Sequence, residues 1–273
     1  MTEANRNMIV RLATAVVACP VMLAMFYLWP PIFFYGLVVT ATAVGGNELF
    51  SMTHPEDKIA RAIGTATCVG TSLAIYFLGS DPRTWMVIAL AAPIVAVVTS
   101  LVRLGEISTA ALRMTALAFG PIYLASLTLL AVLLRDQPHG AGYVVWTLMI
   151  AWFGDTFGYF FGRFLGKHKL YEAVSPKKTI EGALGGLLGS VTGTLLAHFG
   201  YLPTLSLVGG IVVALVGGSL GILGDLGESL LKRSTGVKDS GQIVPGHGGI
   251  LDRIDALLMA STIVFLYTRF VQG

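Results

Sequence analysis

Long apolar runs recur along this 273-residue chain and constrain its fold more than any other feature. Several runs approach or exceed ~18 residues with few or no charges, the length at which an apolar helix can cross a bilayer. Charged residues make up only 12% of the chain, roughly half of their usual share in soluble domains. The pattern predicts an all-α, polytopic integral membrane protein.

We expect about nine transmembrane helices, separated by short segments rich in proline and polar residues. The first apolar run has no cleavage motif at its end, so we expect it to remain as the first helix. Residues 1–140 should form about five nearly featureless helices, and residues 141–273 should carry the polar chemistry. The predicted spans are 9–28, 31–50, 60–79, 84–102, 110–134, 141–162, 183–200, 204–224 and 254–271.

Lysine and arginine are distributed unevenly among the predicted loops. With nine spans, 15 of the 18 basic residues fall on the side of the N-terminus. The other side holds Arg83, Arg135 and Arg269. Because cytoplasmic loops carry the excess of basic residues, the N-terminus should lie in the cytoplasm.

Glycines recur every four positions in two of the predicted helices. One series runs from Gly154 to Gly166 and the other from Gly185 to Gly193. Small residues at this spacing line one helix face and let two backbones approach closely. We therefore expect the helices over 141–162 and 183–200 to pack tightly together.

The segment between the last two predicted helices concentrates charge. Asp225, Glu228 and Lys232 share one helix face, and Asp252 shares a face with Asp255. If these helix ends converge, their carboxylates suit Mg²⁺, which takes hard oxygen ligands and substrate phosphates. The nearby cations that would suit phosphate oxygens are Lys232, Arg233, Lys238 and Arg253.

A simpler explanation exists for each of these residues alone. Asp252 would cap the last helix, and Asp255 would be favoured in its first turn by the helix dipole. Lys232 and Arg233 would only anchor the chain at the membrane surface. Asp225 argues against this explanation, because it follows the apolar stretch GGSLGILG and ionisable groups at such depth are usually functional.

The segment SPKKTIEG, from Ser175 to Gly182, leaves two interpretations open. Lys177, Lys178 and the Ser175 hydroxyl, beside a helix N-terminus, would form a cradle for phosphates. Alternatively, Ser175 begins a turn, Thr179 caps the next helix and the lysines only set topology. The chain has no GxxxxGK[ST] motif, so a nucleotide site here would not be a P-loop.

Three blocks carry a family resemblance: GDTFGYFFGRFLGKHKL, SPKKTIEG and SLLKRSTGVKDSGQIVPGHGGILDRID. The third has S-x-x-K-R, K-D-S, P-x-H-G-G and D-R-x-D in order. Together the blocks resemble the signature of the CDP-diacylglycerol synthases, or phosphatidate cytidylyltransferases. Over the first 150 residues the resemblance rests on hydropathy alone.

The resemblance implies that CTP and phosphatidate react to give CDP-diacylglycerol and pyrophosphate in phospholipid biosynthesis. It implies Mg²⁺, with K⁺ beside it, and a homodimer in the bilayer of the inner (plasma) membrane. The active site would face the cytoplasm, and no nucleic acid partner is expected.

Site roles are carried over by position. The metal ligands would be Asp225, Asp252 and Asp255, joined by Asp239. Lys232 would face the phosphates and act with Asp252 and Asp255 as a catalytic residue. Substrate contacts would come from Ser175, Lys177, Lys178, Arg233, Lys238 and Arg253, with Glu181 supporting its loop.

His247 has a smaller expected role. A phosphatidate oxygen is the nucleophile and is already ionised at neutral pH, so the reaction needs no strong base. Positioning and electrostatic stabilisation supply most of the catalysis in such transfers. We therefore expect His247 to shape the loop or contact substrate.

Two other classes compete with this hypothesis. Polyprenol or phytol kinases and CDP-archaeol synthases also place charged groups at cytoplasmic helix ends, but the complete K-D-S to D-R-x-D block argues against the kinases. A transporter would instead carry ionisable residues near helix centres, such as Glu48 or His198. The charge here collects at one membrane face, which favours an enzyme.

Overall fold

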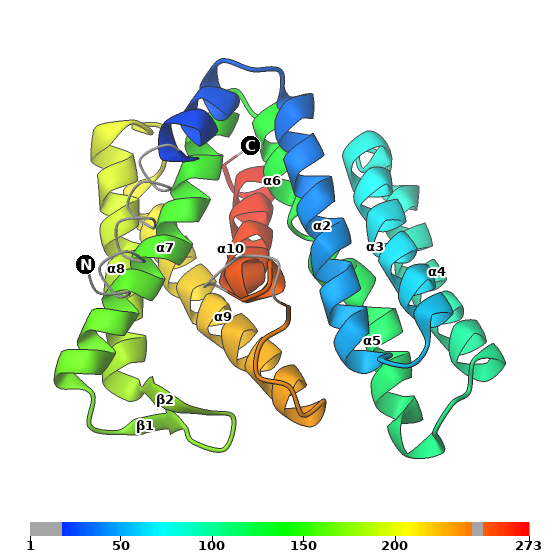
Figure 1. The fold of residues 1–273 in the computed structure, drawn as a ribbon. Helices are drawn as coiled ribbons and strands as arrows, with labels where there is room; N and C mark the ends of the chain where they lie inside the picture. Colours follow the sequence, from blue (N-terminus) through cyan, green and yellow to red (C-terminus); the bar gives the residue numbers. More distant parts are fainter. Residues whose placement is uncertain (1–17, 242–247, 273) are drawn as a thin grey trace, which may run out of the picture.

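The computed structural model describes residues 18–241 and 248–272. Helices dominate this part of the chain (Figure 1). Following a short apolar helix, Ala18–Tyr27, they are α2 (Pro31–Thr53), α3 (Lys58–Leu78), α4 (Pro82–Val102), α5 (Ile107–Ala125), α6 (Thr128–Asp136), α7 (Gly140–Leu165), α8 (Ile180–Gly200), α9 (Leu207–Ser234) and α10 (Leu251–Phe270).

Seven candidate membrane spans occur among the described residues, by length and apolar composition: α2, α3, α4, the stretch Ile107–Asp136, α7, α8 and α9. The all-α, polytopic class is therefore confirmed. The count of nine and the cytoplasmic N-terminus remain predictions. The first predicted span, 9–28, lies partly outside the described residues.

One predicted span is divided in two. The run over 110–134 becomes α5 and α6, which meet at Ser126 and Leu127. The Ser126 hydroxyl donates to the carbonyls of Tyr123, at 2.6 Å, and of Leu258 in α10, at 3.1 Å. The break between α5 and α6 thus occurs where Ser126 contacts α10.

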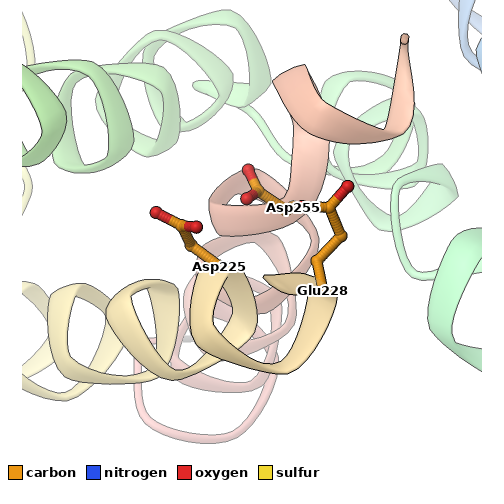
Figure 2. A group of neighbouring side chains, drawn as sticks. All are labelled: Asp225, Glu228 and Asp255. Carbon is orange, nitrogen blue, oxygen red and sulfur yellow. The ribbon is translucent and has the colours of Figure 1, made fainter. Parts of the chain in front are cut away.

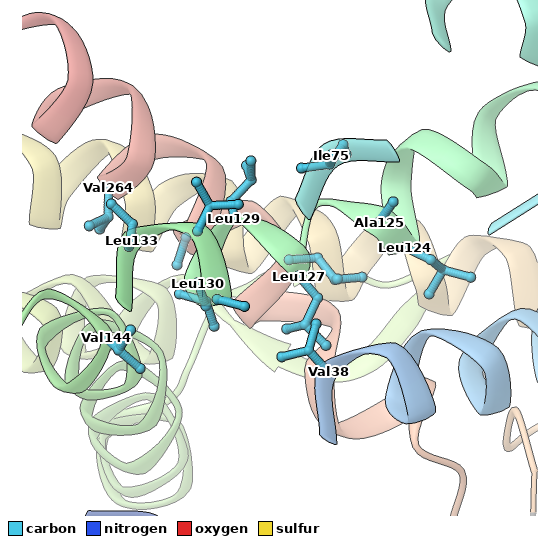
Figure 3. Close-up of a cluster of buried hydrophobic side chains, with 14 of the residues drawn as sticks. Val38, Ile75, Leu124, Ala125, Leu127, Leu129, Leu130, Leu133, Val144 and Val264 are labelled. Atoms are coloured by element: carbon cyan, nitrogen blue, oxygen red, sulfur yellow. The ribbon is translucent and has the colours of Figure 1, made fainter. Parts of the chain in front are cut away.

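The hydrophobic core centres on α6, all of whose residues from Thr128 to Leu134 are buried. Figure 3 shows Leu133 next to Val264 of α10 and Leu130 above Val144 of α7, while Leu127 lies near Val38 of α2. The core therefore joins the first helices to α7 and α10, and it fixes α10 relative to both.

A small hairpin interrupts the helices between α7 and α8. Strands β1 (Lys169–Tyr171) and β2 (Ser175–Thr179) pair antiparallel, with Lys169 opposite Thr179. No strand pattern is visible in the sequence here, because the strands have only three and five residues. Thr179 ends β2 and caps α8, accepting the Gly182 N–H at 3.1 Å, as one of the two interpretations of SPKKTIEG predicted.

Glycines bring α7 and α8 together, as predicted. A Cβ added at Gly189 of α8 would lie 2.3 Å from the Phe153 carbonyl oxygen of α7, and one at Gly186 would lie 3.1 Å from that of Gly154. Side chains at these positions would push the helices apart. The close approach brings the α7 C-terminus, the hairpin and the α8 N-terminus to one end of the bundle (Figure 1).

Candidate functional site

A cavity of about 700 Å³ lies among α7, α8, α9, α10 and β2. One part is ionic and is lined by Asp225, Glu228, Lys232 and Asp255. The other part reaches Ser190, at the middle of α8, and is lined there by small or apolar residues, including Ile150, Gly217 and Ala260. The cavity therefore joins a charged end to the middle of the helices.

Three carboxylates meet at the charged end (Figure 2). Asp225 and Glu228 come from α9, and Asp255 comes from α10. One oxygen of each lies within 4.8 Å of those of the other two. Asp225 lies nine residues before the end of α9, which is roughly 13 Å along the helix, so α10 must begin deep in the bundle to bring Asp255 beside it.

Two lysines stand against these carboxylates. Lys178 Nζ lies 2.5 Å from Asp225 Oδ2. Lys232 Nζ lies 2.5 Å from Glu228 Oε2 and 2.5 Å from Asp252 Oδ1. Six carboxylates and five lysine or arginine side chains line the cavity, so its lining holds a small excess of negative charge, which favours a bound cation.

The donor set fits a small divalent cation. All three groups of the carboxylate cluster offer hard oxygen atoms, which Mg²⁺ prefers. Among the described residues, Glu228 Oε1 is buried without a hydrogen-bond partner. Such an orphaned acceptor is costly unless something binds it.

Asp252 lies at the edge of the cluster and is held by the loop before α10. Its Oδ2 accepts the Ser240 N–H at 3.0 Å, the Ser240 hydroxyl at 2.8 Å and the Gly249 N–H at 2.9 Å. Its other oxygen contacts Lys232. These contacts position Lys232 and the loop, and a metal-ligand role for Asp252 stays a prediction.

Other predicted site residues are divided between the cavity and its surroundings. Lys177, Lys178, Arg253 and Asp239 line the cavity. Arg233 and Lys238 are exposed and, like Ser175 in β2, are absent from its lining. His247 lies outside the described residues.

Glu181 contacts the chain that leads into the hairpin. Its carboxylate accepts the backbone N–H of Lys167 at 3.0 Å and that of His168 at 3.2 Å. The His168 ring Nδ1 lies 2.6 Å from Glu181 Oε1. The side chain thereby ties the start of α8 to the chain that enters β1.

Sequence reasoning left several cavity residues unassigned. The helical spacing places Glu228 on the same helix face as Asp225 and Lys232 but predicts no role for it. Asp155, Tyr159 and Arg163 of α7 also line the cavity. The sequence block GDTFGYFFGR could have indicated these residues, because their spacing of four places Asp155, Tyr159 and Arg163 along one helix face.

The fold and cavity define a class: a polytopic membrane protein with a carboxylate and lysine site suited to a divalent cation and phosphates. A family model described as "Cytidylyltransferase family" matches residues 9–271. The chain is also 34% identical to the phosphatidate cytidylyltransferase of Pseudomonas aeruginosa, over 92% of this chain and 93% of that protein. The chain belongs to the cytidylyltransferase family.

Shorter matches have higher identity. The phosphatidate cytidylyltransferase of Staphylococcus haemolyticus is 45% identical over 122 residues, and that of Staphylococcus epidermidis is 44% identical over 124. These matches span about half the length of the staphylococcal relatives, 47% and 48%, and 45% of this chain. The sequence resemblance to this family is confirmed.

Proposed function

We propose that the protein is a phosphatidate cytidylyltransferase, which converts CTP and phosphatidate to CDP-diacylglycerol and pyrophosphate. The observation that carries this proposal is the cavity. Its charged end suits a triphosphate and a lipid phosphate, and its small and apolar depth among membrane helices suits a diacylglycerol. The relatives from Staphylococcus haemolyticus and Pseudomonas aeruginosa are phosphatidate cytidylyltransferases, which agrees with this activity.

The chemistry requires positioning more than proton transfer. A phosphate oxygen of phosphatidate forms a bond to the α-phosphorus of CTP, and the bond from that phosphorus to the bridging oxygen of pyrophosphate breaks. Both reactants are anions, so the site must bring like charges together and stabilise the departing pyrophosphate. Fixed electrostatics supply such stabilisation without a general base.

The carboxylate cluster would hold Mg²⁺ through Asp225, Glu228 and Asp255. When bound, this ion would neutralise phosphate charge at the reacting centre. Lys178 and Lys232 are already placed among the carboxylates, and each would turn toward phosphate when substrate enters. The K⁺ implied by the family resemblance has no assigned ligands here.

The triphosphate would lie at the hairpin side of the cavity. Lys177 and Arg163 line this side and offer cationic donors. The α8 N-terminus begins directly after β2, at Ile180, and its dipole favours an anion. These features support binding of CTP between β2 and α7.

We place the site on the cytoplasmic side of the inner (plasma) membrane, because the basic loops share this end of the bundle and CTP is a soluble nucleotide.

A homodimer is the assembly expected from the family resemblance. Analytical ultracentrifugation in detergent would measure it.

One assay tests the activity. Purified protein in detergent, given CTP, phosphatidate and Mg²⁺, should release pyrophosphate and form CDP-diacylglycerol. Lys232→Met should abolish the product, because it removes the cation between Glu228 and Asp252. The control Arg269→Ala, at the far end of α10, should remain active.

Assays with different lipid substrates distinguish the alternative functions. Phosphate transfer from CTP to a polyprenol, with no product from phosphatidate, would instead indicate a lipid kinase. Wild-type protein that releases no pyrophosphate with any lipid phosphate would overturn the proposal.

A further inference from the structure

A buried carboxylate on α2 lies outside the cavity lining and has no part in the proposed chemistry. Glu48 is only 3% exposed, although it sits within an apolar helix. A buried carboxylate is costly unless it is well hydrogen-bonded. Its partners therefore indicate what it does.

Those partners belong to the start of α10, more than 200 residues away. Glu48 Oε1 accepts the Ile250 N–H at 3.0 Å, and Oε2 accepts the Leu251 N–H at 2.9 Å. The N-cap residue of α10, Ile250, makes no side-chain capping bond. Glu48 thus satisfies N–H groups that a local cap would otherwise serve.

A second contact reaches the other end of the same loop. The Ser240 hydroxyl lies 3.4 Å from Glu48 Oε2 and 2.8 Å from Asp252 Oδ2. One buried hydroxyl therefore stands between the α2 carboxylate and the aspartate that holds Lys232. Glu48 contacts described residues on both sides of the segment 242–247.

Two glycines of the loop leave the space that this arrangement needs. A Cβ at Gly241 would stand 2.5 Å from Glu48 Oε1, and one at Gly249 would stand 2.6 Å from Glu48 Oε2. Real Cβ atoms do not approach so closely. The glycines of the loop are thus fitted to a carboxylate that comes from α2.

We propose that Glu48 is a positioning residue for the cytidylyl transfer: it fixes the start of α10, and through it Asp252 and Asp255, from the first half of the chain. This inference rests on the proposed function. Asp255 lies about one helical turn beyond the N–H groups that Glu48 accepts, so a shift at Leu251 would move Asp255 relative to Asp225 and Glu228 on α9. Glu48 is not among the residues that line the cavity.

The variants Glu48→Gln and Asn47→Ala of the full-length protein test this role. Glutamine keeps the size of the side chain but replaces one acceptor oxygen with an NH₂ group, which would face a backbone N–H. We expect kcat to fall at least tenfold and KM for CTP to change less than twofold, since the hairpin side is untouched. Asn47 is exposed on the same helix, and its change to alanine should leave both constants unaltered.

Hydrogen exchange of the same proteins supplies a readout that is independent of activity. In Glu48→Gln the amides of Ile250 and Leu251 should exchange at least tenfold faster, while those in the middle of α8 keep their protection. Equal loss of protection in α8 would indicate general destabilisation and overturn the positioning role. Unchanged exchange at Ile250 and Leu251, or kcat equal to wild type, would also overturn it.

The two proposals fail in different ways. If wild-type protein forms no CDP-diacylglycerol, the proposed function fails, and with it the catalytic meaning of Glu48. Selective exchange at Ile250 and Leu251 would then still establish that Glu48 holds the start of α10.

Discussion

The two halves of the helix bundle bury their contacts by different means. In α2–α6, large side chains such as Phe50, Leu117 and Leu130 fill the interior. In α7 and α8, glycine brings backbones together. Buried polar groups bond across helices in both halves: Ser72 lies 2.7 Å from Thr128 in the first half, and two such bonds lie in the second. Ser190 donates to the Ile150 carbonyl at 2.9 Å, and the Trp146 indole donates to Thr194 at 2.9 Å.

This difference indicates that the first half of the bundle mainly supports the fold, whereas the second half carries the reaction. Large apolar side chains fill space and resist rearrangement, whereas glycine contacts let helices stand close and leave the neighbouring cavity unfilled. We therefore expect changes in the first half to alter stability and changes around the cavity to alter the reaction. Glu48 is the exception, because it lies in the first half and holds the second.

The largest effect should come from the carboxylate cluster. Asp255→Asn removes one negative ligand from the three, and we expect kcat to fall by about 10²–10³-fold. The melting temperature should not fall, because the change also relieves repulsion among buried carboxylates. Pyrophosphate release and thermal unfolding in detergent measure the two quantities.

The control for this variant is Glu56→Gln, an exposed carboxylate before α3. Its activity should equal that of wild type. Asp255→Asn protein with more than a tenth of wild-type kcat would contradict the role of the cluster.

A core substitution in the first half should lower stability and leave kcat almost unchanged, which is the opposite of the effect expected for Asp255→Asn. Leu130→Ala leaves a cavity at a residue that is 1% exposed, and we expect a loss of about 2–4 kcal/mol of unfolding free energy. At low temperature, where the variant stays folded, kcat should stay within twofold of wild type. A large loss of kcat in folded protein would break the division between the halves.

Lysines at the cavity should affect nucleotide binding more modestly. Lys177→Ala should raise KM for CTP by about tenfold, because Lys177 lines the hairpin side of the cavity. Lys238 is exposed and absent from that lining, so Lys238→Ala should raise KM less. The reverse order would favour the sequence-based role of Lys238 over the geometry.

The smallest effect concerns an ion pair far from the cavity. Arg103 lies 2.9 Å from both oxygens of Asp57, and this hydrogen-bonded guanidinium lowers the pKa of Asp57 to about 2. A lowered acid pKa stabilises the fold above the unfolded value of about 3.9, and this contribution is lost as pH falls through about 2. Asp57→Asn should therefore lower Tm by about 1–2 °C at pH 7, with the difference shrinking between pH 4 and pH 2 and activity unchanged.

The sequence predicted most helices because hydropathy and proline are local signals. The span predicted over 84–102 is α4, Pro82–Val102. The break between α5 and α6 could not be seen, because both are apolar and Ser126 is tied to α10 by tertiary contact. The hairpin also escaped prediction, since strands of three and five residues are too short to show a hydrophobic alternation.

The candidate site was predicted in part for the same reason. Helical spacing placed Asp225, Glu228 and Lys232 on one face, and all three line the cavity. Spacing could not show that Glu228 joins the carboxylate cluster while Asp252 instead meets Lys232 and Ser240. The role of Glu48 depends on a contact between the second and last helices, which a single sequence does not reveal.

Cation binding by the carboxylate cluster tests the central claim most directly. Mn²⁺ has the same preference for oxygen ligands as Mg²⁺, and its binding to purified protein can be measured by electron paramagnetic resonance. Wild-type protein should bind Mn²⁺ in competition with Mg²⁺, and the double variant Asp225→Asn, Asp255→Asn should lose this binding while remaining folded. Binding of equal affinity in the folded double variant would contradict the account.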